Sequence, residues 1–180
     1  MTKLIILLLL PSLLLTQKEV EIPQGLMHNY KIKPNNVENI HVTNWLLNIP
    51  SDKTFKNKFV VLNYWCDSPV CVNALNKIET LISLFSHKKK LIFVTYSNDD
   101  SLSTVNQLKK YKVDTKSTVV INTRKVDNLW SNGIDRIVFP FLLLIDDRGK
   151  TIWVTSSSSI NEEVLDSFLK RKLEPATSFR

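Results

Sequence analysis

The sequence predicts an α/β protein with a parallel-cored central sheet, closed by an antiparallel hairpin and a final helix. Two observations support this class. Short apolar runs typical of buried strands recur along the chain, and segments whose apolar residues follow a helical period lie between them. Strands that alternate with helices favour parallel pairing. The 180 residues, of which 43% are hydrophobic, are enough for one domain with a full core.

The N-terminal segment differs from the rest of the chain. Lys3 is followed by about a dozen apolar residues, which is typical of a secretory signal peptide over residues 1–16. This run is shorter than the roughly 20 residues that a membrane-spanning helix needs, although an uncleaved anchor is the alternative. Residues 17–36 are polar, contain Pro23 and Pro34, and are predicted to form an extended lead-in. We therefore expect an exported protein of the periplasm or cell envelope, with secretion as the alternative, in a compartment where disulfides persist.

The predicted domain covers residues 37–172, and a tail without pattern follows at residues 173–180. A first strand and turn are expected between Val37 and Leu47, with core anchors at Trp45, Leu46 and Leu47. Further strands are expected at residues 59–65, 91–96, 118–121, 141–145 and 151–154. The last two form a hairpin around the turn at residues 146–149, which contains Gly149.

Helices are predicted between these strands and after the hairpin. The first has Ser68 as its N-cap and Pro69 as its first residue, and its apolar positions are Cys71, Ala74, Leu75, Ile78, Leu81, Ile82 and Phe85. A second helix, capped from residues 98–101, has apolar positions at Leu102, Val105 and Leu108. A short third helix contains Val126, Leu129 and Trp130 and ends near Asn132 and Gly133. The last begins with a capping box of Ser159 and Glu162, and its apolar face comprises Ile160, Val164, Leu165, Phe168 and Leu169.

The two cysteines of the chain, Cys66 and Cys71, lie between the second predicted strand and the first predicted helix. A helix N-terminus carries partial positive charge, which stabilises a thiolate and lowers its pKa. The negative charge of Asp67 acts the other way and raises the pKa of a neighbouring thiol. Three interpretations stay open at this point: a redox-active pair, a structural disulfide, and two free thiols.

The chain resembles the thioredoxin superfamily, and in particular its exported TlpA-like branch of thiol-disulfide oxidoreductases. The resemblance covers roughly residues 37–172 and is carried by Trp45-Leu46, Val60-Val61-Leu62-Asn63-Tyr64-Trp65, Phe139-Pro140, Leu142-Leu143-Leu144-Ile145-Asp146 and Gly149-Lys150. It implies a thioredoxin-like fold, with a central mixed β-sheet flanked by helices and a cis-proline before the closing β-hairpin. Pro140 falls at that proline position. The resemblance also implies that Trp65, Phe139 and Pro140 hold the substrate beside Cys66 and Cys71.

The cysteine motif departs from the family pattern. Four residues separate Cys66 from Cys71, where the family has Cys-x-x-Cys. With the helices aligned, Cys71 takes the place of the second family cysteine, Ser68 takes the place of the first, and Cys66 falls on the preceding loop. Asn63 stands where ordinary thioredoxins have an acid beneath the cysteines.

The function implied by the resemblance is thiol-disulfide exchange through Cys66 and Cys71 in the cell envelope. Protein thiols or disulfides would be the substrates, and an envelope redox partner would recycle a monomeric protein. No cofactor is expected, because electrons pass directly between sulfurs. The alternative is a redox-inactive module that binds a protein partner through the same groove. A peroxidase is a weaker alternative, because the sequence around Cys66 offers no arginine.

Two other classes of partner are not expected. Lys and Arg outnumber Asp and Glu by 24 to 17, but the basic residues are scattered except at Lys88-Lys89-Lys90. Single-stranded nucleic-acid binding requires aromatic residues interleaved with the basic ones, and this sequence does not have that pattern. The three histidines, His28, His41 and His87, are far apart and lack neighbours at ligand spacing, so no metal site is expected.

Overall fold

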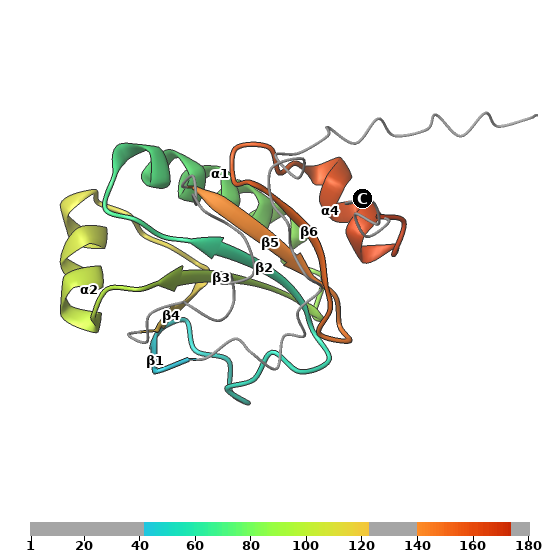
Figure 1. Cartoon of the computed structure of the whole chain (residues 1–180), viewed down its shortest axis with the longest axis horizontal. Coiled ribbons are helices and arrows are strands. Elements are labelled where there is room, and N and C mark those ends of the chain that lie inside the picture. The colour runs from blue at the N-terminus through green and yellow to red at the C-terminus, as the bar shows by residue number, and fades with distance from the viewer. Residues whose placement is uncertain (1–41, 123–139, 174–180) are drawn as a thin grey trace, which may run out of the picture.

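The computed structural model describes residues 42–122 and 140–173. These residues form a six-stranded sheet with helices packed against it (Figure 1). The strands are β1 (Asn44–Leu47), β2 (Phe59–Tyr64), β3 (Leu91–Ser97), β4 (Thr118–Ile121), β5 (Phe141–Ile145) and β6 (Thr151–Ser156). The described helices are α1 (Pro69–Phe85), α2 (Ser101–Lys110) and α4 (Glu162–Leu169).

The sheet is mixed and has the strand order β1-β4-β3-β2-β5-β6. Strands β2, β3 and β4 are parallel, and they are linked by α1 and α2. Strand β1 pairs antiparallel with β4, β5 pairs antiparallel with β2, and β6 completes the hairpin. This arrangement confirms the predicted α/β class and its mixed central sheet.

The core has two layers because β2 is buried on both faces. Val61 belongs to a cluster that contains residues of α1, α2 and α4. Val60 and Leu62 point to the opposite layer, where Phe55 and residues of β3, β4, β5 and β6 meet. The continuous apolar run predicted this double burial, and every residue of β2 is buried.

The predicted core anchors of the first strand are only partly confirmed. Trp45 and Leu46 are half-buried, and Leu47 is 37% exposed. Among the described strands, β1 lies at the edge of the sheet and pairs only with β4, so it is covered less than a central strand. Trp45 packs on Phe55 at a distance of 5.1 Å between ring centroids.

The N-cap of the last helix lies two residues after the predicted cap. Asn161 is the N-cap of α4, and its Oδ1 accepts a hydrogen bond of 2.9 Å from the Val164 amide. The predicted capping box of Ser159 and Glu162 is therefore wrong. Ser159 is instead held in the turn after β6, where its amide donates to the Ser156 carbonyl at 2.9 Å.

Other predicted local features are confirmed. Helix α1 begins at Pro69 after the N-cap Ser68. The hairpin turn follows β5, with Gly149 at φ 84°, a value that glycine adopts without steric cost. The predicted signal peptide, lead-in and third helix, and the tail beyond Leu173, lie outside the described residues. Among the residues that are described, no helix has the length and apolar character needed to cross a membrane.

Candidate redox site

A disulfide joins Cys66 and Cys71 at the junction of β2 and α1, with a distance of 5.7 Å between their Cα atoms. The chain leaves β2 through Trp65, whose amide donates to the Tyr96 carbonyl of β3 at 2.8 Å. A turn follows, in which the Ser68 amide donates to the Cys66 carbonyl at 2.8 Å. This turn brings the loop back over the helix start. Because the two sulfurs are bonded to each other, the interpretation as two free thiols is wrong.

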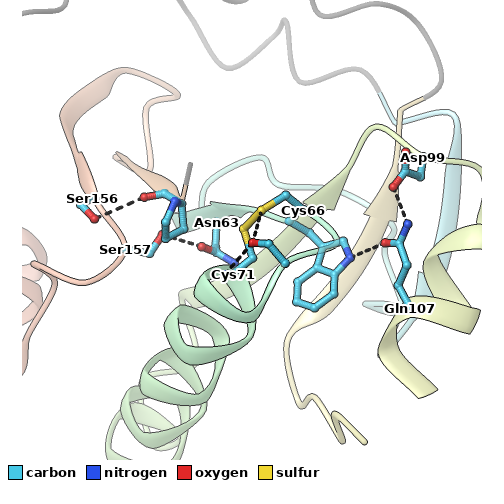
Figure 2. Close-up of a disulfide and its surroundings, with 10 residues drawn as sticks. Asn63, Cys66, Cys71, Asp99, Gln107, Ser156 and Ser157 are labelled. Atoms are coloured by element: carbon cyan, nitrogen blue, oxygen red, sulfur yellow. Dashed lines mark hydrogen bonds between the residues drawn. A yellow bond between two sulfur atoms is a disulfide. The ribbon is translucent and has the colours of Figure 1, made fainter. Parts of the chain in front are cut away.

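The two sulfurs have different surroundings (Figure 2). Cys71 lies in the first turn of α1 and is 1% exposed, whereas Cys66 is half-buried on the loop. Val70, which follows the N-cap by two residues, is 58% exposed. Cys66 is therefore the more exposed residue of the pair.

Ser68 connects both halves of the disulfide through its hydroxyl. Its Oγ accepts a hydrogen bond of 3.3 Å from the Cys71 amide, which is the expected contact of an N-cap. The same Oγ lies 3.1 Å from Cys66 Sγ. A disulfide sulfur carries no hydrogen, so the Ser68 hydroxyl is the donor in this second contact. The sequence indicated the cap at Ser68, but not its contact with Cys66, because the loop path was not predictable.

Asp67 forms an ion pair that lowers its influence on the sulfurs. Its carboxylate accepts from Lys110 Nζ at 3.0 Å. The hydrogen bonds from Lys110, and secondarily from Tyr111, hold the pKa of Asp67 below its usual value. The ammonium group offsets the charge that was expected to raise the pKa of a neighbouring thiol. Sequence reasoning missed Lys110, because its partner is 43 residues away along the chain.

Trp65 is buried beside the disulfide and takes part in a polar chain. Its side chain belongs to the core, with 4% of the residue exposed. Its Nε1 donates to Gln107 Oε1 at 2.7 Å, and Gln107 Nε2 donates to Asp99 Oδ2 at 2.7 Å (Figure 2). The indole thus anchors the loop to α2. Its predicted role in substrate binding stays a prediction.

Asn63 forms a buried polar pair with Ser157 below the disulfide (Figure 2). Asn63 is 1% exposed and Ser157 is fully buried. The Ser157 hydroxyl donates to Asn63 Oδ1 at 2.6 Å. Within the described part of the chain, Asn63 Nδ2 has no hydrogen-bond partner. Both side chains are uncharged at all ordinary pH values, so this pair offers no group that exchanges protons with the sulfurs.

Pro140 lies at the same edge of the sheet as the disulfide. In the antiparallel β2–β5 pair, Asn63 is opposite Leu142. Continuing this register by two residues places Pro140 opposite Trp65, immediately before Cys66. The Pro140 carbonyl accepts from the Ser157 amide at 3.2 Å, which connects it to the Asn63 pair. Phe139 lies outside the described residues, and the cis state of the bond before Pro140 stays a prediction.

No protein-family model matches the sequence, and no curated protein matches it. A thiol-disulfide oxidoreductase from Bacteroides fragilis has a similar solved structure, with a TM-score of 0.50, 21% identity, and coverage of 68% of this chain and 87% of that one. A thiol-disulfide isomerase from Corynebacterium glutamicum has a TM-score of 0.54 at 14% identity, with coverage of 73% and 92%. The chain has a thioredoxin-like fold.

The thioredoxin-like fold confirms the resemblance drawn from the sequence, at the level of architecture. In this fold the disulfide is placed after a central strand and at the start of a helix, where the sequence predicted the site. Residues 42–122 and 140–173 contain no group of three or more potential metal-ligating side chains.

Proposed function

We propose that this protein is a thiol-disulfide oxidoreductase of the cell envelope, and that it works by reversible opening of the Cys66–Cys71 disulfide. The observation that carries this proposal is the disulfide between the loop after β2 and the first turn of α1, which joins the half-buried Cys66 to the fully buried Cys71. The fold shared with solved oxidoreductases is further support. Thiol-disulfide exchange needs this asymmetry, because only one sulfur should meet the substrate.

Cys66 is the proposed sulfur for the exchange with substrate. In the oxidised protein, a substrate thiolate attacks Cys66 Sγ, the disulfide breaks, and Cys71 leaves as a thiolate. A second substrate thiolate then attacks the substrate sulfur of the mixed disulfide and releases Cys66. Two electrons pass from substrate to protein, and the two protons of the substrate thiols end on the cysteines. The reverse sequence reduces a substrate disulfide.

Cys71 is the proposed resolving thiol. It lies in the first turn of α1, where the partial positive charge of the helix N-terminus stabilises the departing thiolate. Its burial at 1% exposure opposes this stabilisation by desolvating the charge. Burial also keeps a bulky substrate away from Cys71 and directs it to Cys66.

Substrate binding is proposed along the edge formed by Pro140 and the α1 start. The Pro140 carbonyl is already bonded to Ser157, so the backbone before it, at Phe139, is the part proposed to hold an extended substrate chain. Exposed Val70 offers an apolar contact beside the disulfide. A protein thiol or disulfide in an extended segment is the proposed substrate.

The proposed location rests on the sequence of residues 1–16 and on the disulfide itself. A signal peptide directs the chain out of the reducing cytosol, and a disulfide persists in an oxidising compartment. An envelope redox partner is then needed to recycle the pair, because one exchange changes the oxidation state of the protein.

The proposed function is tested by single-turnover oxidation of a peptide that contains two free thiols. The oxidised protein should remove two thiols from the peptide for each molecule of protein. Cys66→Ser and Cys71→Ser should both lose this reaction, because neither can form the disulfide. After mixing with oxidised glutathione, Cys71→Ser should accumulate a mixed disulfide at Cys66, while Cys66→Ser should react at least about tenfold more slowly at the buried Cys71.

Failure of the wild-type protein to oxidise the peptide, in the presence of an intact disulfide, would contradict the proposal. The thioredoxin-like domain would then be a binding module whose disulfide is structural. If both single-cysteine variants formed the mixed disulfide with glutathione at the same rate, the separate roles assigned to Cys66 and Cys71 would be contradicted.

A further inference from the structure

The hydroxyl of Ser68 is aimed at Cys66, the more exposed residue of the disulfide. Its Oγ is 3.1 Å from Cys66 Sγ, and it accepts the Cys71 amide at 3.3 Å. Because a disulfide sulfur carries no hydrogen, the Ser68 hydroxyl is the donor in its contact with Cys66. This side chain therefore differs from an ordinary N-cap, which only accepts a hydrogen bond from the helix.

We propose that Ser68 is a catalytic residue of the exchange reaction, whose hydroxyl donates a hydrogen bond to the Cys66 thiolate. This inference rests on the proposed function of Cys66. A hydrogen bond to a charged sulfur is stronger than one to a neutral sulfur, so the contact favours the reduced, ionised state over the disulfide. Ser68 thereby compensates for the position of Cys66, which lies on the loop before the helix and not at its N-cap.

Ser68 contributes to two steps: the release of Cys66 as a thiolate from the mixed disulfide, and the attack of the Cys66 thiolate on a substrate disulfide. When the mixed disulfide opens, the bond between Cys66 Sγ and the substrate sulfur breaks, and Cys66 keeps the electron pair as a thiolate. Ser68 donates to that developing negative charge without giving up its proton. In the opposite direction, the same hydrogen bond increases the fraction of Cys66 that is ionised and able to attack a substrate disulfide.

The neighbouring charges are consistent with this assignment. Asp67 is the acidic group adjacent to Cys66, and its carboxylate is paired with Lys110 at 3.0 Å. The hydroxyl of Ser68 is thus an uncharged donor next to a balanced ion pair. Ser68 stands at the N-cap, in the place of the first family cysteine, and from there it donates to the thiolate of Cys66 on the preceding loop.

The test measures the pKa of Cys66 in the Cys71→Ser background, where Cys66 is the remaining thiol. The rate of alkylation is followed against pH. Adding Ser68→Ala should raise the pKa of Cys66 by about one unit, which is about tenfold less thiolate below the pKa. Ser68→Thr should restore the pKa, since it keeps a hydroxyl at the N-cap. Ser68→Asp should raise it further, because the carboxylate caps the helix but cannot donate, and its negative charge disfavours the thiolate.

Loss of the cap is a separate effect of Ser68→Ala, and Asn161→Ala is the matched control. It removes the cap of α4, whose described contact is with Val164. The control should leave the pKa of Cys66 unchanged. In the protein with both cysteines, Ser68→Ala should shift the equilibrium with glutathione up to tenfold towards the disulfide, which is about 30 mV for a two-electron couple.

An unchanged pKa in Ser68→Ala would overturn the assignment of Ser68, whatever the result for Ser68→Asp, because the carboxylate raises the pKa of a neighbouring thiol by its charge alone. An equal shift in Asn161→Ala would also overturn it, since the effect would then come from general loss of stability. These readouts use the thiol alone and do not need turnover. Failure of the wild-type protein to oxidise a dithiol peptide would instead count against the proposed function.

Discussion

Two uncharged polar side chains, Ser68 and Asn63, lie close to the disulfide. Ser68 contacts Cys66 Sγ at 3.1 Å, and Asn63 lies below the disulfide, bonded to Ser157 at 2.6 Å. The sequence indicated both positions as departures from the family pattern. It did not indicate their partners, because Ser157 is 94 residues from Asn63. Contacts of this kind depend on the folded sheet and cannot be derived from local spacing.

The buried Asn63 position leads to a prediction on pH. In Asn63→Asp, burial disfavours the carboxylate and raises its pKa in the folded state above the unfolded value of about 3.9. The variant should therefore approach wild-type stability below about pH 4 and lose stability as pH rises through the folded-state pKa. We expect a deficit of about 1–3 kcal/mol at neutral pH, from urea unfolding at several pH values.

Asn63→Leu is the control for this prediction. It has a similar volume, carries no titratable group and should show no pH-dependent deficit. An Asn63→Asp variant whose stability relative to the wild-type protein is the same in acid and at neutral pH would mean that the position is hydrated enough to hold a charge.

The starts of α1 and α4 show which parts of an element can be predicted. Ser68 with Pro69 is a strong local signal, and the helix begins there. Before α4, both Ser159 and Asn161 are good N-cap residues, so the local sequence does not choose between them. The turn after β6 decides, because it uses Ser159 to close on Ser156. The turn that follows β6 thus selects one of two equivalent signals.

The N-cap of α4 gives a direct test at this scale. Asn161→Ala should lower the free energy of unfolding by about 1 kcal/mol, because the Val164 amide loses its acceptor. Ser159→Ala should lower the free energy of unfolding by less than about half of that amount. Urea unfolding of the two variants at one pH compares them. A larger loss for Ser159→Ala would restore the capping box that the sequence predicted.

At the scale of the whole molecule, the apolar runs and their helical connections predicted the sheet well. The parallel core followed from the alternation of strands and helices, and the hairpin followed from the turn at Gly149. The reduced burial of the first strand was not predictable, because an edge position is a property of the completed sheet. The pairing of Cys66 with Cys71 also depends on the loop path, which the four intervening residues alone leave open.

The redox potential of the Cys66–Cys71 couple tests the central proposal most directly. The protein is equilibrated in glutathione buffers, and the free thiols are trapped and counted. A reversible couple between roughly −120 and −270 mV, the range of proteins that exchange disulfides, is the result we predict. A potential below about −300 mV would contradict it, because such a disulfide resists reduction and serves the structure.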